Sequence, residues 1–227
     1  MSFQDWLFYT RITENIVASN IHLENENISP PQGTGSLRVR DSGAPAVATV
    51  AFVPNPYLFD DRIEVGRIHT IFRKRTGSGF QDSGLFFLSQ GSDPTRDNIS
   101  LYAVYFSNGT TTVRLMKYPN GLHNYADGIL LQSYTVPFSG LQEDVVIEAE
   151  WQGGILTRTT GYTSIQIRYG SNTVNFNNLV NLSPVIHDST NLLFTGTSPG
   201  VFVRSRHQSE PLNAVVDTTE IYRKNLS

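Results

Sequence analysis

The stretch Glu143-Asp-Val-Val-Ile-Glu-Ala-Glu-Trp-Gln152 decides the fold class of this sequence. Every odd-numbered position from Val145 to Trp151 is apolar, whereas Asp144, Glu148 and Glu150 share the opposite side. A period of two is typical of a β-strand that buries one of its faces. The stretch from Thr163 to Tyr169 repeats the alternation. The two stretches therefore predict neighbouring antiparallel strands, each half-buried.

Working outward, the rest of the chain divides into short apolar stretches separated by turn-forming residues such as Asn108-Gly109. The stretch Leu85-Phe-Phe-Leu88 is apolar on both faces, which predicts a central strand. No stretch predicts a helix. The predicted strands span residues 6–11, 36–40, 46–53, 66–75, 84–90, 100–107, 112–118, 129–136, 144–152, 163–169, 192–195, 201–207 and 215–223. This spacing predicts an all-β fold, in which two antiparallel sheets form a β-sandwich.

The composition limits the classes of partner. The 227 residues carry 17 basic and 20 acidic side chains and no cysteine, and the net charge is −3. A single domain of this size buries enough apolar surface to fold without disulfides. The net charge gives no basic field for nucleic acid, and no apolar stretch approaches the length of a membrane helix. We therefore expect neither nucleic acid nor a membrane as a partner. The N-terminus lacks the basic and apolar regions of a signal peptide, which predicts synthesis in a cytoplasm without secretion.

The first 35 residues differ in character from the remainder. They hold one aromatic stretch, Trp6 to Arg11, followed by Asn- and Glu-rich sequence and the pair Pro30-Pro31. Prolines remove backbone donors, so we expect an irregular N-terminal arm over 1–35 and the sandwich domain over 36–227. Trp6, Phe8 and Tyr9 are the candidate anchors of this arm on a neighbouring subunit. The alternative is that Trp6 to Arg11 forms an edge strand of the sandwich.

The order of several segments along the chain supports a resemblance to a known superfamily. The segments are Gly66-Arg-Ile-His-Thr-Ile-Phe-Arg-Lys-Arg75, Asp82-Ser-Gly-Leu-Phe-Phe87, Leu101-Tyr-Ala-Val-Tyr-Phe106, Val145-Val-Ile-Glu-Ala-Glu-Trp151 and Val215-Val-Asp-Thr-Thr-Glu-Ile-Tyr222. Over roughly residues 36–224 the sequence resembles the concanavalin A-like lectin/glucanase superfamily in its laminin-G-like form. The resemblance implies a jelly roll of two large curved antiparallel sheets. It does not by itself imply an activity.

Asp144, Glu148 and Glu150 are the candidate carboxylates for glycoside hydrolysis, which needs two such groups on either side of one bond. The resembling glucanases carry Glu-x-Asp-x-x-Glu on one strand. Here Glu148-Ala-Glu150 is followed by Trp-Gln-Gly, so the middle Asp and the last Glu are missing. Pairing of these carboxylates with Arg168 on the next strand is the preferred interpretation. We therefore predict no catalytic residues, and a glycoside hydrolase is the third functional hypothesis.

A calcium ion is the one cofactor that the sequence leaves open. The five histidines are scattered and cysteine is absent, which argues against a zinc site. Calcium prefers oxygen ligands from loops, and Asp93, Asp97 and Asn98 offer them, as do Asp60 and Asp61. The resemblance points the same way, since laminin-G-like domains often bind calcium near such loops. Asp and Asn are also ordinary turn residues.

Tyrosines in or beside predicted loops are the candidates for stacking on sugar rings. They are Tyr57, Tyr118, Tyr125, Tyr134 and Tyr162.

The densest positive charge is Arg73-Lys74-Arg75, to which Arg67, Arg204 and Arg206 add. Alternation along a strand divides such a run between two faces. An acidic protein partner therefore suits it better than a nucleic acid, which would need a basic stripe.

The leading functional hypothesis is a non-enzymatic structural protein of a virus or phage particle. Such a chain would act as a capsid decoration or cement protein, or as a tail accessory, through contacts with other virion proteins. We expect a homotrimer located in the virion. The alternative is a carbohydrate-binding, lectin-like module that recognises a receptor through its loop tyrosines.

Overall fold

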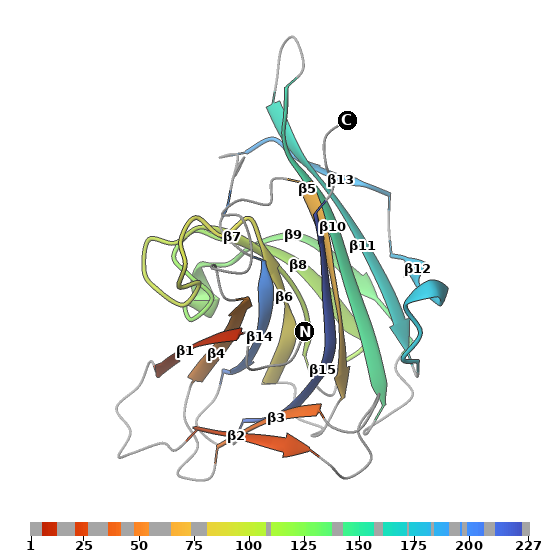
Figure 1. Ribbon diagram of the computed structural model, residues 1–227. Coiled ribbons are helices and arrows are strands. Elements are labelled where there is room, and N and C mark those ends of the chain that lie inside the picture. Colours follow the sequence, from red (N-terminus) through yellow and green to blue (C-terminus); the bar gives the residue numbers. More distant parts are fainter. Residues whose placement is uncertain are drawn as a thin grey trace.

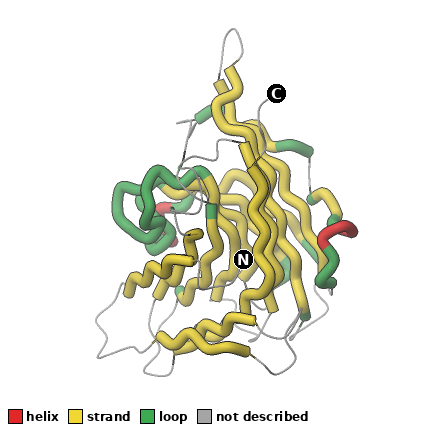
Figure 2. The backbone as a smooth tube through the Cα atoms, viewed as in Figure 1, coloured by secondary structure: helices red, strands yellow, loops and turns green. Residues whose placement is uncertain are grey.

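The computed structural model describes residues 6–12, 21–26, 36–41, 48–54, 65–73, 81–107, 110–137, 143–156, 161–171, 173–182, 184–190, 196, 199–206 and 212–223. Almost all of the regular structure in this part of the chain is β-strand, with two short 3₁₀ turns (Figure 2). The elements are β1 (Trp6–Ile12), β2 (Ile21–Glu26), β3 (Ser36–Asp41), β4 (Ala48–Pro54), β5 (Val65–Arg73), β6 (Gln81–Phe87), β7 (Leu101–Ser107), β8 (Thr112–Tyr118), η3 (Tyr125–Asp127), β9 (Ile129–Thr135), β10 (Asp144–Leu156), β11 (Gly161–Ser171), η4 (Phe176–Asn178), β12 (Val180–Asn181), β13 (Ile186–Asp188), β14 (Gly200–Ser205) and β15 (Asn213–Arg223).

Two antiparallel sheets face each other and form a β-sandwich (Figure 1). The first sheet has the strand order β1-β4-β14-β6-β7-β8-β9. The second has the order β12-β11-β10-β5-β15-β3-β2, and β13 also pairs with β11. This architecture confirms the all-β, two-sheet prediction. Because β14 and β15 insert between strands from the first half of the chain, residues far apart in the sequence share one sheet face.

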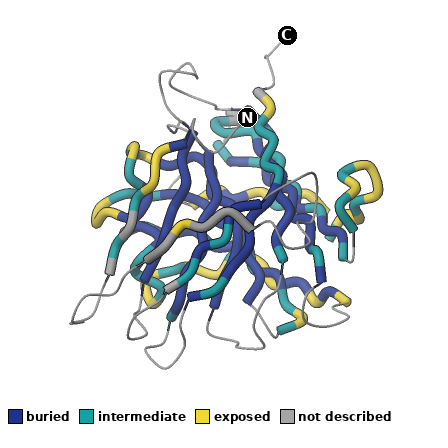
Figure 3. Tube along the Cα trace, turned by 60° about the horizontal axis from the view of Figure 1, so that its bottom comes forward, coloured by how far each residue is buried: buried dark blue, intermediate teal, exposed yellow. Residues whose placement is uncertain are grey.

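The main core lies between the sheets and takes one face from most of the strands. Phe87, Tyr102 and Trp151 stack in parallel there, with Phe87 ring centroids 5.6 Å from Tyr102 and 5.0 Å from Trp151. The alternating residues of β10 and β11 point into this core, as predicted. Buried residues run along the central strands in Figure 3, so the sandwich interior is continuous between the two sheets.

A second apolar cluster covers the outer face of the first sheet. Its strand residues include Phe86, Tyr105 and Phe202, and the connecting segments 88–100 and 119–128 pack on them through Leu122 and Ile99. These segments also bond to each other, through the Leu122 amide to the Pro94 carbonyl at 2.9 Å. Strand β6 is therefore buried on both faces, as its apolar sequence predicted.

Two segments within the predicted arm are strands of the sandwich. Strand β1 pairs with β4 at the edge of the first sheet, and β2 pairs with β3 at the edge of the second. The Trp6 side chain enters the main core, whereas Phe8 is 41% exposed. The edge-strand alternative therefore describes Trp6–Ile12. The arm as a docking device, and the domain boundary after residue 35, stay predictions.

The sequence did not predict β2, β12 or β13, which are short or polar. The strand predicted over 192–195 lies outside the described residues. None of the helical turns in the described part of the chain could span a bilayer.

Candidate functional site

His69 is the centre of a polar cluster on the outer face of the second sheet. It belongs to β5, where its register partners are Glu148 on β10 and Glu220 on β15. The three side chains are therefore neighbours in one row across three strands, although 151 positions separate His69 from Glu220 in the sequence. Their outward orientation follows from the alternation along each strand, since Ile68, Ile147 and Ala149 fill the core.

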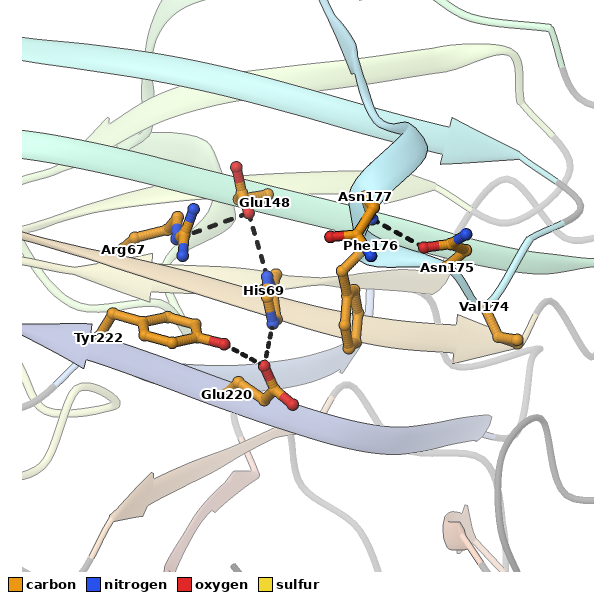
Figure 4. Close-up of a pocket in the computed structure, with 9 residues that line it drawn as sticks. All are labelled: Arg67, His69, Glu148, Val174, Asn175, Phe176, Asn177, Glu220 and Tyr222. Atoms are coloured by element: carbon orange, nitrogen blue, oxygen red, sulfur yellow. Dashed lines mark hydrogen bonds and ion pairs between the residues drawn. The ribbon is translucent and has the colours of Figure 1, made fainter.

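Each ring nitrogen of His69 contacts one carboxylate. Nδ1 lies 3.0 Å from Glu148 Oε2, and Nε2 lies 2.9 Å from Glu220 Oε2 (Figure 4). An ionised carboxylate only accepts hydrogen bonds, so both ring nitrogens act as donors when both carboxylates are charged. The ring links the two acidic groups into one hydrogen-bonded unit.

Two arginines complete the charge balance around this unit. Arg168 on β11 donates to Glu148 and, at 2.9 Å, to Glu150. Arg67 on β5 lies 3.8 Å from Glu148 Oε2. The predicted pairing of Glu148 and Glu150 with Arg168 is thus confirmed. Glu148 is buried, however, with its side chain only 4% exposed, so it is not the solvated residue that the alternation suggested.

An aromatic ring borders the cluster on the solvent side. Tyr222 on β15 donates a hydrogen bond to Glu220 Oε2, and the Arg67 guanidinium lies 4.4 Å from the centre of the Tyr222 ring. A cation over a ring face is attracted by the ring quadrupole, which fixes both side chains. Tyr222 nevertheless remains 42% exposed.

The segment 173–178 forms a wall beside the cluster. Phe176 in η4 stacks on the His69 ring, with centroids 3.8 Å apart and an interplanar angle of 10°. Local hydrogen bonds hold the segment in shape, because Asn175 accepts from the Asn177 amide at 2.8 Å and Thr173 accepts from the Asn175 amide at 3.0 Å.

The polar cluster around His69 forms the floor, and the segment 173–178 one wall, of a pocket of about 500 Å³, which we name the His69 pocket (Figure 4). This volume lies within the range of small-ligand sites, roughly 300–1,000 Å³. The lining residues are Arg67, His69, Glu148, Val174, Asn175, Phe176, Asn177, Glu220 and Tyr222.

Both carboxylates beside His69 have lowered pKa values. Burial by itself would raise the pKa of Glu148, but hydrogen bonds from His69 and Arg168 outweigh burial and lower it. The hydrogen bond from Tyr222, and after it the one from His69, lowers the pKa of Glu220. The contact with Glu220 in turn raises the pKa of Tyr222. The pocket therefore presents fixed, ionised acceptors at neutral pH.

No protein-family model matches this chain, and no curated protein matches it in sequence. Solved structures do match. The exoplasmic/lumenal domain of VIP36, in its Ca²⁺/Man3GlcNAc-bound form, is similar with a TM-score of 0.58 and 9% identity, over 99% of this chain and 88% of that one. A family 16 endo-glucanase from Bacteroides ovatus has a TM-score of 0.53 and 8% identity, over 94% of each chain. The carbohydrate-binding module CBM66 from Bacillus subtilis has a TM-score of 0.52 and 12% identity, over 93% of this chain and 99% of that one.

The fold is a concanavalin A-like jelly roll. The predicted resemblance is thereby confirmed at the level of fold, which is what similarity at such low identity shows.

Within the jelly roll, the described tyrosines among those predicted to stack on sugars do not form one exposed surface. Tyr118 and Tyr134 are buried, so neither offers a ring face to a ligand. Tyr125 is half-buried in the second apolar cluster, and Tyr162 is half-buried against the His187 ring. Tyr57 lies outside the described residues. The aromatic residues at the pocket, Tyr222 and Phe176, were not among the candidates.

The sequence also missed His69 and Glu220 as members of a site. The signal that could have found them is weak: Arg67 and His69 alternate with apolar residues on one predicted strand, as Glu220 and Tyr222 do around Ile221. These side chains contact each other because β5 lies between β10 and β15 in the sheet, and the sequence of a single strand does not predict which strands are its neighbours.

The candidate calcium loop does not fit a calcium site in the described residues. Asp93 accepts hydrogen bonds from Thr95 and pairs with Arg96, and Asp97 pairs with Arg11 and His123. No three or more His, Asp or Glu side chains of the described segments gather where they could hold a metal. Asp60 and Asp61 lie outside these segments.

The described members of the predicted basic run do not share one surface. Arg204 is buried beside Asp82 in the first sheet, with N–O distances of 2.7 and 3.0 Å. Arg73 pairs with Asp144 at 2.7 Å on the second sheet. Lys74 and Arg75 fall outside the described residues. The described arginines of the run are thus divided between the two sheets and paired internally, so they offer no shared surface to an acidic partner.

Proposed function

We propose that this chain binds a carbohydrate in the His69 pocket. The observation that carries the proposal is the exposed ring of Tyr222, fixed between Arg67 and Glu220 at the pocket mouth. An aromatic face beside planar, hydrogen-bonding groups suits a sugar, whose ring has apolar C–H faces and hydroxyl edges. Asn175 and Asn177 in the wall add amide donors and acceptors.

The structural neighbours support this class of ligand. VIP36 was solved with a mannose-containing oligosaccharide, and CBM66 is itself named a carbohydrate-binding module. The alternative function predicted from the sequence is therefore the one we favour, with the His69 pocket replacing the loop tyrosines as its site.

We propose binding without hydrolysis. A glycosidase needs one carboxyl group that stays protonated near neutral pH to donate to the leaving oxygen, which requires a raised pKa. The carboxylates beside His69, Glu148 and Glu220, have lowered pKa values instead. Glu220, whose side chain is 44% exposed, can accept from ligand hydroxyls.

Tyr222→Ala tests the proposal on a printed array of oligosaccharides, followed by calorimetry on the sugars that bind. We expect the variant to lose binding by at least about tenfold, which corresponds to ~1.4 kcal/mol. Tyr162→Ala is the matched control, because Tyr162 does not line the pocket and was a sequence candidate. Equal losses in both variants, or loss only in Tyr162→Ala, would contradict the site, and an array without any bound sugar would contradict the function.

Assembly into a particle is the second candidate function. One observation favours it: both edge strands of the first sheet expose large apolar side chains, Leu7 and Phe8 on β1 and Ile129 and Leu130 on β9. Exposed apolar edges are surfaces on which other chains can pair. The virion role, its homotrimer and its virion location stay proposals on this basis. A glycan-binding jelly roll could also serve as the receptor-binding part of such a particle.

Calcium stays a proposal too, since VIP36 was solved with this ion. A rise in the melting temperature on adding CaCl₂, reversed by EDTA, is the expected result.

A further inference from the structure

The His69 pocket is open at one end and closed at the other. Along the outer face of β5, exposure falls from 40% for the Arg67 side chain to 4% for His69, and Ile71 is fully buried. These residues are successive outward positions of one strand. The face of the sheet therefore becomes covered in the direction from Arg67 to Ile71.

Strand β10 shows the same gradient in register. Its residues Glu150, Glu148 and Val146 pair with Arg67, His69 and Ile71. The Glu150 side chain is 33% exposed, the Glu148 side chain 4%, and Val146 is fully buried. On both β5 and β10, the outer face of the sheet thus becomes buried from the paired positions His69 and Glu148 onward.

The covering element is the segment from Thr173 to Val180. Its Thr173 amide donates to the Asp144 carbonyl at 3.3 Å, beyond the buried end of the pocket. Phe176 then lies on His69, and Val180 returns to pair with Tyr169 on β11. In Figure 4, η4 and Val174 lie on one side of His69, and Arg67 and Tyr222 lie on the other. The pocket therefore has a mouth at Arg67 and Tyr222 and a wall at Phe176.

We infer that the His69 pocket takes the terminal residue of a glycan chain and excludes internal residues. The inference rests on the proposed function. A polysaccharide bound through an internal residue must leave the site in two directions, which an open groove across the sheet would permit. The wall at Phe176 blocks the direction along β5 toward Ile71, so a chain that runs along the strands can leave only past Arg67 and Tyr222.

The experiment uses the full chain and linear oligosaccharide series of one to six residues, built separately from mannose, glucose, xylose and fructose. Each is tested with a free non-reducing end, with that end capped by O-methylation, and with a free or methyl-blocked reducing end. We expect the affinity for the preferred series to reach its plateau by the disaccharide or trisaccharide. Capping one of the two ends should weaken binding by about tenfold or more, because a methyl group overfills a closed pocket.

Phe176→Ala gives a second readout. Removing the wall should reduce the effect of the cap to within about twofold, with unchanged circular dichroism, because the pocket then has two exits. Phe8→Ala, on the other sheet, is the control and should retain the full effect of the cap.

The outcomes separate the two proposals. Affinity that keeps rising to the hexasaccharide, or caps at both ends that have no effect, overturns chain-end recognition and leaves carbohydrate binding in place. Failure of all four series together with an array without binding overturns both.

Discussion

At the scale of single residues, Arg204 is a buried cation with several hydrogen-bond partners. It is 1% exposed, and it donates to Asp82, to the Leu122 carbonyl at 2.7 Å and to the Tyr118 hydroxyl at 3.1 Å. Burial by itself would lower the pKa of Arg204, but Tyr118 and Asp82 outweigh burial and raise it. This guanidinium joins the first sheet to the segment 119–128 that covers it.

Arg204→Met should therefore destabilise the fold. The variant leaves Asp82 buried with Arg206 as its remaining cation, 3.1 Å away. Breaking a buried pair costs about 3–5 kcal/mol, and the second arginine places the expected loss near 3 kcal/mol. Urea unfolding measures the change. Arg96→Met is the control, because the Arg96 side chain is 75% exposed and its pair with Asp93 should contribute less than about 1 kcal/mol. Equal midpoints for Arg204→Met and the wild type would contradict this assignment.

Ionised Glu220 stabilises the folded chain, so the free energy of unfolding depends on pH through this group. Its folded pKa is lowered, so the stabilisation it gives is present above its ordinary pKa of 4.5 and is lost as pH falls through the folded value. Tyr222→Phe removes the largest cause of the shift. We expect the pKa of Glu220 to rise toward its ordinary value in a ¹³C carboxyl NMR titration, while the pKa of Glu148 stays low. An unchanged Glu220 titration would show that the Tyr222 hydroxyl does not hold this carboxylate.

At the scale of elements, β1 distinguishes the two interpretations of the N-terminal segment, as an edge strand that closes the sandwich or as an arm that docks on a neighbouring subunit. Trp6 is 5% exposed and packs in the main core, whereas Phe8, on the same face of the strand, stays 41% exposed and meets the Phe52 ring edge-on at 5.3 Å. The same strand thus contributes one side chain to the sandwich and presents another to solvent.

Trp6→Ala should cost about 3–5 kcal/mol of unfolding free energy, because it leaves a large cavity in the core. Phe8→Ala should cost only about 1 kcal/mol, since the lost contact is a single aromatic pair at the surface. Chemical denaturation of both variants at low protein concentration measures the difference. If Trp6→Ala matched the wild type there, Trp6 would be an anchor on a neighbouring subunit instead of a core residue.

At the scale of the whole molecule, the first sheet ends in exposed apolar residues on both sides. Ile129 is 52% and Leu130 54% exposed on β9, and Phe8 occupies the opposite edge on β1. Such edges favour pairing between copies. Light scattering coupled to size exclusion should give the wild type a mass of three chains and the Ile129→Lys, Leu130→Lys variant a mass of one. A wild type that stays a single chain at all concentrations would contradict the trimer.

The fold class follows from patterns within single segments of the chain. Alternation in β10 and β11 predicts strands with one buried face, and the apolar sequence of β6 predicts a strand buried on both faces. Each of these patterns, like the turns between them, is contained in one short segment. The pairing of Arg168 with Glu148 and Glu150 was also readable, because β10 and β11 are consecutive and half-buried.

Only the tertiary structure decided the site. His69, Glu148 and Glu220 meet because β5 lies between β10 and β15, and Phe176 reaches them because the segment after β11 folds back over the sheet. It also decided that Tyr118 is buried and that Trp6 belongs to the core. The physical reason is that side-chain alternation fixes which way a residue points, whereas the order of strands depends on long-range pairing that no single segment encodes.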